Sequence, residues 1–204
     1  MSDDAIVHVI DDTKSDRLMI GQMLESAGYR VRVYPGARTF MERFSPSGRG
    51  CLVLDFKMPG MDGMELQALI RRKGWTIPIV FCTGEATVEV AVEAMRMGAI
   101  SLIEKPVVAE KLLACVEEAV VRGDSVMLDE SMAAQIEERL PLLTKTERLV
   151  LDRVVAGLSS EEIAEEMCRS RKTVELHRSN IKKKLGNNNV GELIRIMTLK
   201  KDAG

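Results

Sequence analysis

Aromatic residues are scarce in this sequence of 204 residues, at 3% of the chain. This scarcity argues against an aromatic-rich β-sandwich and favours an aliphatic, methionine-filled core of helices on a Val, Ile and Leu sheet. No apolar run approaches the roughly 20 residues that a membrane-spanning helix needs. The acidic N-terminus lacks the basic start of a signal peptide. We therefore expect neither a secreted nor a membrane protein.

Cysteine is also scarce, and its spacing does not fit a metal site. The four residues Cys51, Cys82, Cys115 and Cys168 are scattered along the chain. This distribution is typical of reduced thiols rather than of a disulfide framework, and it predicts a cytoplasmic protein. Hydrophobic residues make up 46% of the chain, which suffices for the core of one large domain or two small ones.

The net charge of −2 conceals an uneven distribution of charge. Residues 1–123 carry a net charge of −2 and residues 124–139 one of −4, whereas residues 140–204 carry +4. The segment 169–184 contains seven basic residues and one acidic residue. A basic cluster on one helix is typical of nucleic-acid binding, and charge alone fits a solvated helix face equally well.

Residues 1–123 alternate short β-branched runs with stretches of helical periodicity. The expected strands are Ile6–Ile10, Arg30–Tyr34, Cys51–Leu54, Ile77–Cys82 and Ile100–Ile103. The expected helices are 16–27, 63–73, 87–97 and 109–121. This alternation predicts an α/β domain with a doubly wound, five-stranded parallel sheet. A site in such a fold lies beyond the carboxyl ends of the strands.

The strand patterns end after residue 123. Residues 124–139 form an acidic connector that we expect to be helical from about Val126. Thr144 with Glu147, and Ser159 with Glu162, have capping-box spacing, and each pair precedes an amphipathic run. Residues 140–204 therefore predict a small all-α domain. Its expected helices are 144–156, 160–167, 171–185 and 189–200.

Acidic residues follow two of the expected strands. Asp11 and Asp12 come after the first strand, and Asp55 comes after the third. Carboxylates held together at one edge of a sheet need a cation, and an all-oxygen ligand set suits Mg²⁺. Thr83 and Lys105 end the fourth and fifth strands and offer a hydroxyl and a positive charge to a phosphoryl group. Each residue alone is common in turns, but the combination predicts phosphoryl transfer to a carboxylate.

Residues 5–122 resemble the receiver domain of two-component response regulators, a flavodoxin-like domain. The matching segments are 9–12, 54–63, 83–84 and 104–106. The resemblance implies that Asp55 accepts a phosphoryl group from a sensor histidine kinase. It implies that Mg²⁺ is bound by Asp12, Asp55 and the backbone carbonyl of Lys57, with Asp11 acting through a water molecule.

The same resemblance implies roles for two further residues and reveals one departure. Lys105, followed by a cis bond to Pro106, and Thr83 would bind the phosphoryl group. Leu102 stands where receiver domains carry an aromatic switch residue. A leucine cannot report activation by ring rotation, so the route from Thr83 to the surface stays open. We interpret His8, in the first strand, as a core histidine rather than a catalytic one.

The expected helices 160–167 and 171–185 form a helix-turn-helix. On the second helix, Val174, His177, Ile181 and Leu185 follow helical spacing and are expected to face the core. The other face mixes basic, short and apolar residues, as a major-groove helix requires. Its candidate DNA contacts are Lys172, Thr173, Glu175, Leu176, Arg178, Ser179, Lys182 and Lys183.

Residues from about 140 to 200 resemble the LuxR-type domain of the NarL/FixJ regulators. The short length of the chain, the Glu-Lys-Pro ending of the receiver domain and the helical connector favour the FixJ branch. The matching segments are 143–148, 157–164, 170–178 and 184–186. The resemblance implies that Glu175, Leu176 and Ser179 contact bases, while the other candidates contact phosphates. It also implies a dimer on double-stranded DNA, with Val190–Met197 in the contact.

These features together predict a regulator of transcription rather than a dedicated enzyme. Phosphorylation of Asp55 would change the surface around Val88, Val92 and Arg96, and RNA polymerase would be a further partner. The sequence leaves open whether activation releases the basic helix or drives dimerisation. The competing hypothesis is a phosphatase-like signalling enzyme with the tail as a protein-interaction module. An RNA-binding tail is disfavoured because its basic face lacks aromatic residues.

Overall fold

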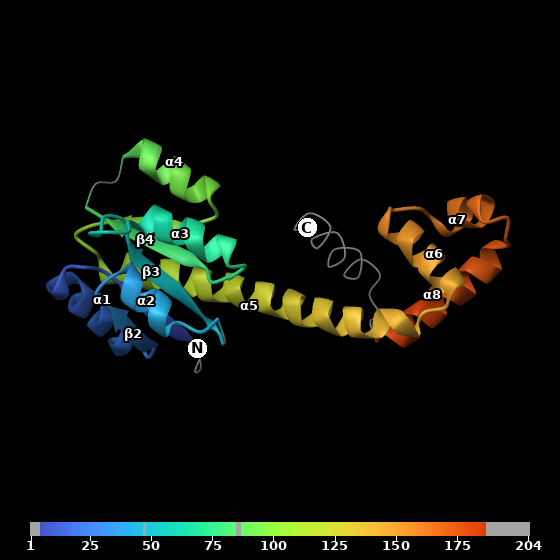
Figure 1. Ribbon diagram of the computed structural model, residues 1–204, viewed down its shortest axis with the longest axis horizontal. Coiled ribbons are helices and arrows are strands. Elements are labelled where there is room, and N and C mark those ends of the chain that lie inside the picture. The colour runs from blue at the N-terminus through green and yellow to red at the C-terminus, as the bar shows by residue number, and fades with distance from the viewer. Residues whose placement is uncertain (1–4, 47, 85–86, 187–204) are drawn as a thin grey trace. The chain divides into compact units, whose positions relative to one another are not determined.

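The computed structural model describes residues 5–46, 48–84 and 87–186. The chain divides into two compact units, Met1–Met127 and Leu128–Gly204. The division falls within a single long helix, α5 (Ala109–Arg139), which contributes to both units (Figure 1). Within the described ranges, no helix combines the length and the apolar composition that crossing a membrane requires.

The first unit is built on a parallel sheet of five strands, as the sequence predicts. The strands are β1 (Ile6–Ile10), β2 (Arg30–Tyr34), β3 (Gly50–Asp55), β4 (Ile79–Thr83) and β5 (Ser101–Glu104). Their order is β2-β1-β3-β4-β5. The chain crosses from β2 over β1 to β3, so the direction of winding reverses between β1 and β3. Ligand sites of open α/β sheets lie at such a reversal.

Helices cover both faces of this sheet (Figure 1). They are α1 (Lys14–Ser26), α2 (Ala37–Arg43), α3 (Gly63–Arg72), α4 (Val88–Arg96) and the first part of α5. Side chains of α1 and α5, such as Leu24 and Leu112, pack on one face. Side chains of α2, α3 and α4, such as Phe40, Leu66 and Ala94, pack on the other. The first unit is therefore a three-layer α/β domain.

Two of these helices differ from the sequence prediction. No helix is expected at α2, a segment of only seven residues. The connector is helical from Val126, as the sequence predicts, but it continues the helix expected at 109–121 without a break, so α5 ends only at Arg139. The continuation passes close to the sheet, because a Cβ atom on Gly123 would lie 3.3 Å from the Gly50 carbonyl oxygen. Glycine at this position allows the helix to approach the strand rather than ending the helix.

The second unit is helical. It contains the end of α5, a short 3₁₀ helix (Leu140–Leu142), α6 (Lys145–Val155), α7 (Ser160–Glu166) and α8 (Arg171–Leu185). Both predicted capping boxes are present, at the starts of α6 and α7. Ala133 and Ile136 of α5 pack in the same core as Ile181 and Leu185 of α8. The helix expected at 189–200 lies outside the described residues.

Candidate functional site

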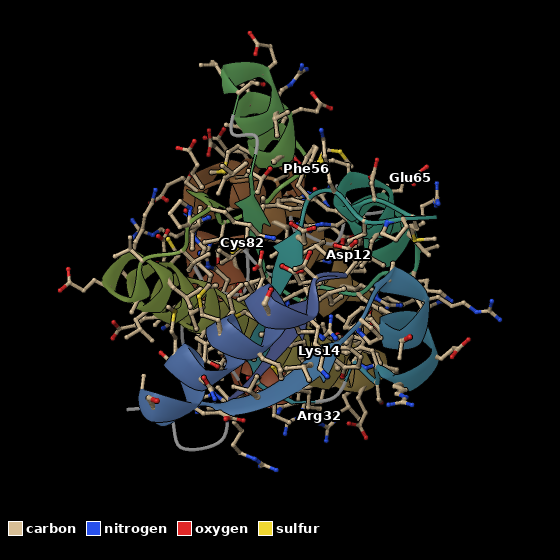
Figure 2. All side chains as sticks on the ribbon, turned by 90° about the vertical axis from the view of Figure 1, so that its left-hand side faces the viewer. Asp12, Lys14, Arg32, Phe56, Glu65 and Cys82 are labelled. Carbon is tan, nitrogen blue, oxygen red and sulfur yellow. The ribbon has the colours of Figure 1, made fainter. Side chains whose placement is uncertain are left out.

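Three carboxylates meet at the carboxyl edge of the sheet. Asp11 and Asp12 follow β1, and Asp55 ends the neighbouring strand β3. Each contributes an oxygen to a group whose atoms all lie within 4.8 Å of one another. Asp11 and Asp55 are buried and Asp12 is exposed, so the group opens to solvent on one side. Figure 2 labels Asp12 in a view onto this end of the unit. The convergence predicted from the sequence is confirmed.

Lys105 places a positive charge in the middle of these acids. Its Nζ atom lies 2.8 Å from Oδ2 of Asp11 and 3.0 Å from Oδ1 of Asp55. A third carboxylate, that of Asp16 in the first turn of α1, lies 3.1 Å from the same nitrogen. Burial alone lowers the pKa of Lys105, but the hydrogen bonds to these three acids outweigh it and raise the pKa. The ammonium therefore stays charged at physiological pH.

Local contacts fix the orientation of Asp11. Its Oδ1 atom accepts a hydrogen bond of 2.8 Å from the backbone N–H of Thr13, while Oδ2 accepts from Lys105. The guanidinium of Arg17 donates to the backbone carbonyl of Asp11. Contacts to both the backbone and the side chain of Asp11 thereby hold the turn between β1 and α1 in place.

Asp55 has a different electrostatic environment. Burial raises the pKa of its carboxyl, the bond to Lys105 lowers it, and the charges of Asp11 and Asp12 raise it again, for a net rise. Gly63, at the start of α3, packs directly behind it, since a Cβ atom there would lie 2.5 Å from the Asp55 carbonyl oxygen. Absence of a side chain at residue 63 is thus a requirement for the position of Asp55.

The remaining predicted residues lie around this centre. Thr83 is buried at the end of β4, and its backbone carbonyl accepts a 2.8 Å hydrogen bond from the Lys105 N–H. The Lys105–Pro106 bond is cis, as expected. Lys57 is exposed two residues after β3, and its carbonyl remains a predicted ligand. Leu102, at the expected switch position, is half-buried and packs against the core that α3 and α4 share.

The donor set suits a hard divalent cation. Three carboxylates outnumber the single ammonium between them, so the buried group carries an excess of negative charge. All of the offered atoms are oxygens, and one side is open to water, which matches the preference of Mg²⁺ for carboxylates and retained waters. The same edge offers Lys105 and the hydroxyl of Thr83, groups that stabilise a phosphoryl oxygen. Chemically, the arrangement is fit for phosphoryl transfer to a carboxylate.

Sequence reasoning missed Asp16, whose carboxylate belongs to this network. In the sequence it is only one residue of the helix expected after the first strand. One feature of the sequence could have indicated its role. Asp16 follows Asp12 by four residues, about one helical turn, in a segment that starts at the carboxyl edge of the sheet. Asp16 lies in the first turn of α1 rather than at a strand end, so the rule that strand ends share one edge does not reach it.

The second candidate surface is α8. Val174, Ile181 and Leu185 are buried in the core of the second unit, so the rest of the helix faces outward. Each predicted DNA contact on α8 is exposed or half-buried, and none is buried. Arg171 pairs with Glu175 at 2.8 Å and also contacts Glu161 of α7. The eight candidates thus remain on an accessible face, three of them lysines.

The two histidines occupy structural positions. His8 is buried, with Nδ1 2.9 Å from the Tyr34 hydroxyl, and its ring packs against Phe40 and Phe44. Burial, with a smaller effect of the Arg32 charge, lowers the pKa of His8 to about 4. This confirms its interpretation as a core histidine. His177 is half-buried, and no hydrogen-bond partner of its buried Nδ1 occurs among the described residues.

Comparison with known proteins identifies both domains. Residues 7–117 match the response regulator receiver domain, and residues 141–197 match the luxR family of bacterial regulatory proteins. The chain therefore belongs to the two-component response regulators that carry a LuxR-type, helix-turn-helix DNA-binding domain. It is a transcription regulator rather than a dedicated enzyme, which excludes the phosphatase-like alternative. Its receiver domain implies a histidine kinase as partner.

Within this family the chain is similar to FixJ. It is 35% identical to the transcriptional regulatory protein FixJ of Bradyrhizobium diazoefficiens over 93% of each chain. It is 36% identical to FixJ of Rhizobium meliloti over 95% of each. Among solved structures, the response regulator StyR has a TM-score of 0.68 and 35% identity, covering 96% of this chain and 98% of its own. Full-length FixJ from B. japonicum has a TM-score of 0.56, 34% identity and coverages of 95% and 96%.

Proposed function

We propose that Mg²⁺-dependent phosphorylation of Asp55 by a sensor histidine kinase controls dimerisation and sequence-specific DNA binding by this protein. The observation that carries the proposal is the bridge from Lys105 to Asp11 and Asp55, with Asp12 beside it. A buried carboxylate beside two further acids contributes little to the stability of the fold. Next to a fixed ammonium, the same carboxylate is well suited to accept a phosphoryl group. Action on DNA implies a cytoplasmic location.

The transfer follows from the positions of the side chains. An oxygen of the Asp55 carboxylate attacks the phosphorus of the kinase phosphohistidine, the new O–P bond forms, and the P–N bond breaks with its electron pair going to the imidazole. Lys105 would neutralise negative charge on the oxygens of the transferred group, and the Thr83 hydroxyl would donate a hydrogen bond to one of them. Asp12, Asp55 and the Lys57 carbonyl would hold Mg²⁺, with Asp11 helping through water. The cation supplies charge neutralisation between the acids and the incoming phosphoryl group.

Helix α8 provides the DNA contacts in this proposal. Lys172, Thr173, Arg178, Lys182 and Lys183 would bind phosphates, which fixes the register of the helix on the duplex. The remaining candidates, Glu175, Leu176 and Ser179, would meet base edges in the major groove. DNA-bound protein would then act on transcription through RNA polymerase. This proposal is supported by the outward position of these side chains on α8, the second helix of the helix-turn-helix that α7 begins.

The surface of α4 is our proposed dimer contact. Val88 and Val92, which are one helical turn apart, are 74% and 52% exposed. Exposed apolar side chains in a row favour association with a second copy over solvent. Leu102 packs beneath, against the core that holds α4. Repacking of this leucine, rather than ring rotation, would carry the change from Thr83 to the contact.

The experiment that tests this function is phosphorylation followed by measurement of oligomeric state. The full chain is incubated with acetyl phosphate and Mg²⁺, and intact mass and light scattering are recorded for the wild type and Asp55→Asn. We expect the mass of one phosphoryl group and a larger dimer fraction in the wild type only. Phosphorylation of the wild type at another residue, or none at all, would contradict the proposal. A Val92→Glu variant that is phosphorylated normally but stays monomeric would assign the dimer contact.

A further inference from the structure

Asp16 contacts the phosphoryl site, yet no motif of the sequence assigns it a role. Its Oδ2 atom lies 3.1 Å from Lys105 Nζ, and its side chain is 33% exposed. The residue sits in the first turn of α1, which begins at Lys14 directly beyond the carboxyl end of β1. A carboxylate from a helix is therefore added to those that the strands supply.

The hydrogen-bonding capacity of Lys105 makes this contact consequential. An ammonium group has three N–H donors and no acceptor. In this structure three carboxylates, those of Asp11, Asp16 and Asp55, lie within 3.1 Å of its nitrogen. The ammonium is thus surrounded by three carboxylates before any phosphoryl group arrives. A phosphoryl group on Asp55 can bind Lys105 only if one of these contacts is given up or shared.

Asp16 is the partner that can leave most readily. Asp11 is buried, and its second oxygen is already held by the Thr13 N–H, so its release would leave an uncompensated buried charge. Asp55 is itself the acceptor. Asp16 is partly exposed, so water can replace the ammonium at its carboxylate at little cost.

We propose that Asp16 is a positioning residue of the phosphoryl site, a counter-ion that holds Lys105 in the unphosphorylated protein and competes with the phosphoryl group for it. The inference rests on the proposed function of the site. Asp16 adds negative charge next to the three acids, so it favours a bound divalent cation. For the same reason it disfavours an anionic phosphoryl group. Its two effects therefore have opposite signs.

A purely local role for Asp16 makes a different prediction. An acidic residue in the first turn stabilises a helix through the macrodipole, and Oδ1 of Asp16 accepts a long contact of 3.4 Å from the Ser15 hydroxyl. Loss of that role would lower the stability of α1. It would leave the binding of anion and cation unchanged, or weaken both together.

The test measures both affinities by calorimetry on the full chain. Mg²⁺ is titrated first, and beryllofluoride, an analogue of the phosphoryl group, is titrated at saturating Mg²⁺. Asp16→Asn removes the charge with little change of shape. We expect Mg²⁺ to bind about three- to tenfold more weakly and beryllofluoride about three- to tenfold more tightly. This is the magnitude expected when one partly screened carboxylate charge is removed at about two hydrogen-bond lengths from the bound ion.

Two control variants separate charge from folding. Glu25→Gln makes the same charge change in the last turn of the same helix and is expected to match the wild type in both titrations. Asp16→Glu keeps the charge and is expected to retain a Mg²⁺ affinity close to that of the wild type. If Asp16→Asn loses stability and Asp16→Glu still weakens Mg²⁺ binding as much, the local role is correct and the proposal is wrong.

The outcomes also separate this inference from the proposed function. If the wild type binds no beryllofluoride with Mg²⁺ present, the proposed function fails. If the wild type binds it and Asp16→Asn gives the same two affinities, the site is as proposed and only the role of Asp16 is refuted. A shift of both affinities in the same direction refutes that role as well.

Discussion

The ion pair between Glu147 and Lys184 allows the stability of the second unit to be tested quantitatively. Oε2 of Glu147 accepts hydrogen bonds from Lys184 Nζ at 2.7 Å and from the Thr144 N–H at 2.8 Å. The side chain of Glu147 is only 4% exposed, while that of Lys184 is 35% exposed. Lys184→Met keeps most of the side-chain volume but leaves the carboxylate with one donor fewer. We expect a loss of about 1–2 kcal/mol, around the lower limit of the range for charged hydrogen bonds, because Lys184 is partly screened by solvent.

Native-state hydrogen exchange of the amides in α6 and α8 is the appropriate assay, because it reports on the second unit separately from the first. A double-mutant cycle with Glu147→Gln isolates the pair from the capping bond to Thr144. The coupling energy is expected to account for most of the loss in Lys184→Met. Additive effects of the two substitutions would refute the reasoning, since they would show that the pair contributes nothing beyond its separate residues.

The pair also predicts how this stability depends on pH. The hydrogen bonds from Lys184 and Thr144 lower the pKa of Glu147 to about 2, below the value near 4.3 of an unfolded chain. A carboxyl with a lowered pKa stabilises the fold above the unfolded pKa and loses that contribution as the pH falls toward the folded pKa. The second unit of the wild type should therefore lose stability between about pH 4.5 and pH 2, and Lys184→Met should lose less. Equal losses in the two proteins would contradict the assignment.

Three further outcomes are expected. His8 should titrate by NMR with a pKa of about 4. The free energy of unfolding of the first unit should fall by about 2 kcal/mol between pH 7 and pH 5, because the unfolded state binds the proton more tightly; an equal fall in His8→Phe would contradict this. Gly63→Ala should destabilise the first unit by about 1–3 kcal/mol in thermal melts and slow phosphorylation from acetyl phosphate, because its Cβ would displace Asp55; wild-type rates would show that the strand yields freely. Arg139→Met should remove the 3.1 Å hydrogen bond to the Leu185 carbonyl and speed amide exchange at the end of α8, and unchanged exchange would argue against this cap.

The sheet and the acidic centre could be predicted because they depend on position along the chain. The carboxyl ends of parallel strands share one edge, so Asp11, Asp12 and Asp55 could be expected to converge there. The pairing of β1 with β3 in the structure brings them together. Lys105 follows from the same rule, since it comes directly after β5. Capping boxes likewise depend on a spacing of three residues, and both were found where the sequence placed them.

The features that escaped prediction depend on contacts between distant residues. The unbroken course of α5 through Gly123 emerges only from the close approach of this glycine to Gly50 and Pro78. The pair of Arg49 with Asp124 then holds this part of α5. Asp16 was missed because its significance lies in the distance to Lys105, far away in the sequence.

The most direct test of phosphorylation-controlled DNA binding is the affinity of the full chain for DNA with and without beryllofluoride, in the presence of Mg²⁺. The duplexes are first enriched from a random pool on the treated protein, and wild type, Asp55→Asn and Lys182→Glu are compared over a range of salt concentrations. We predict that treatment strengthens binding of the wild type only, and that Lys182→Glu reduces both the affinity and its salt dependence. Equal affinity of the treated and untreated wild type would contradict control of α8 by Asp55.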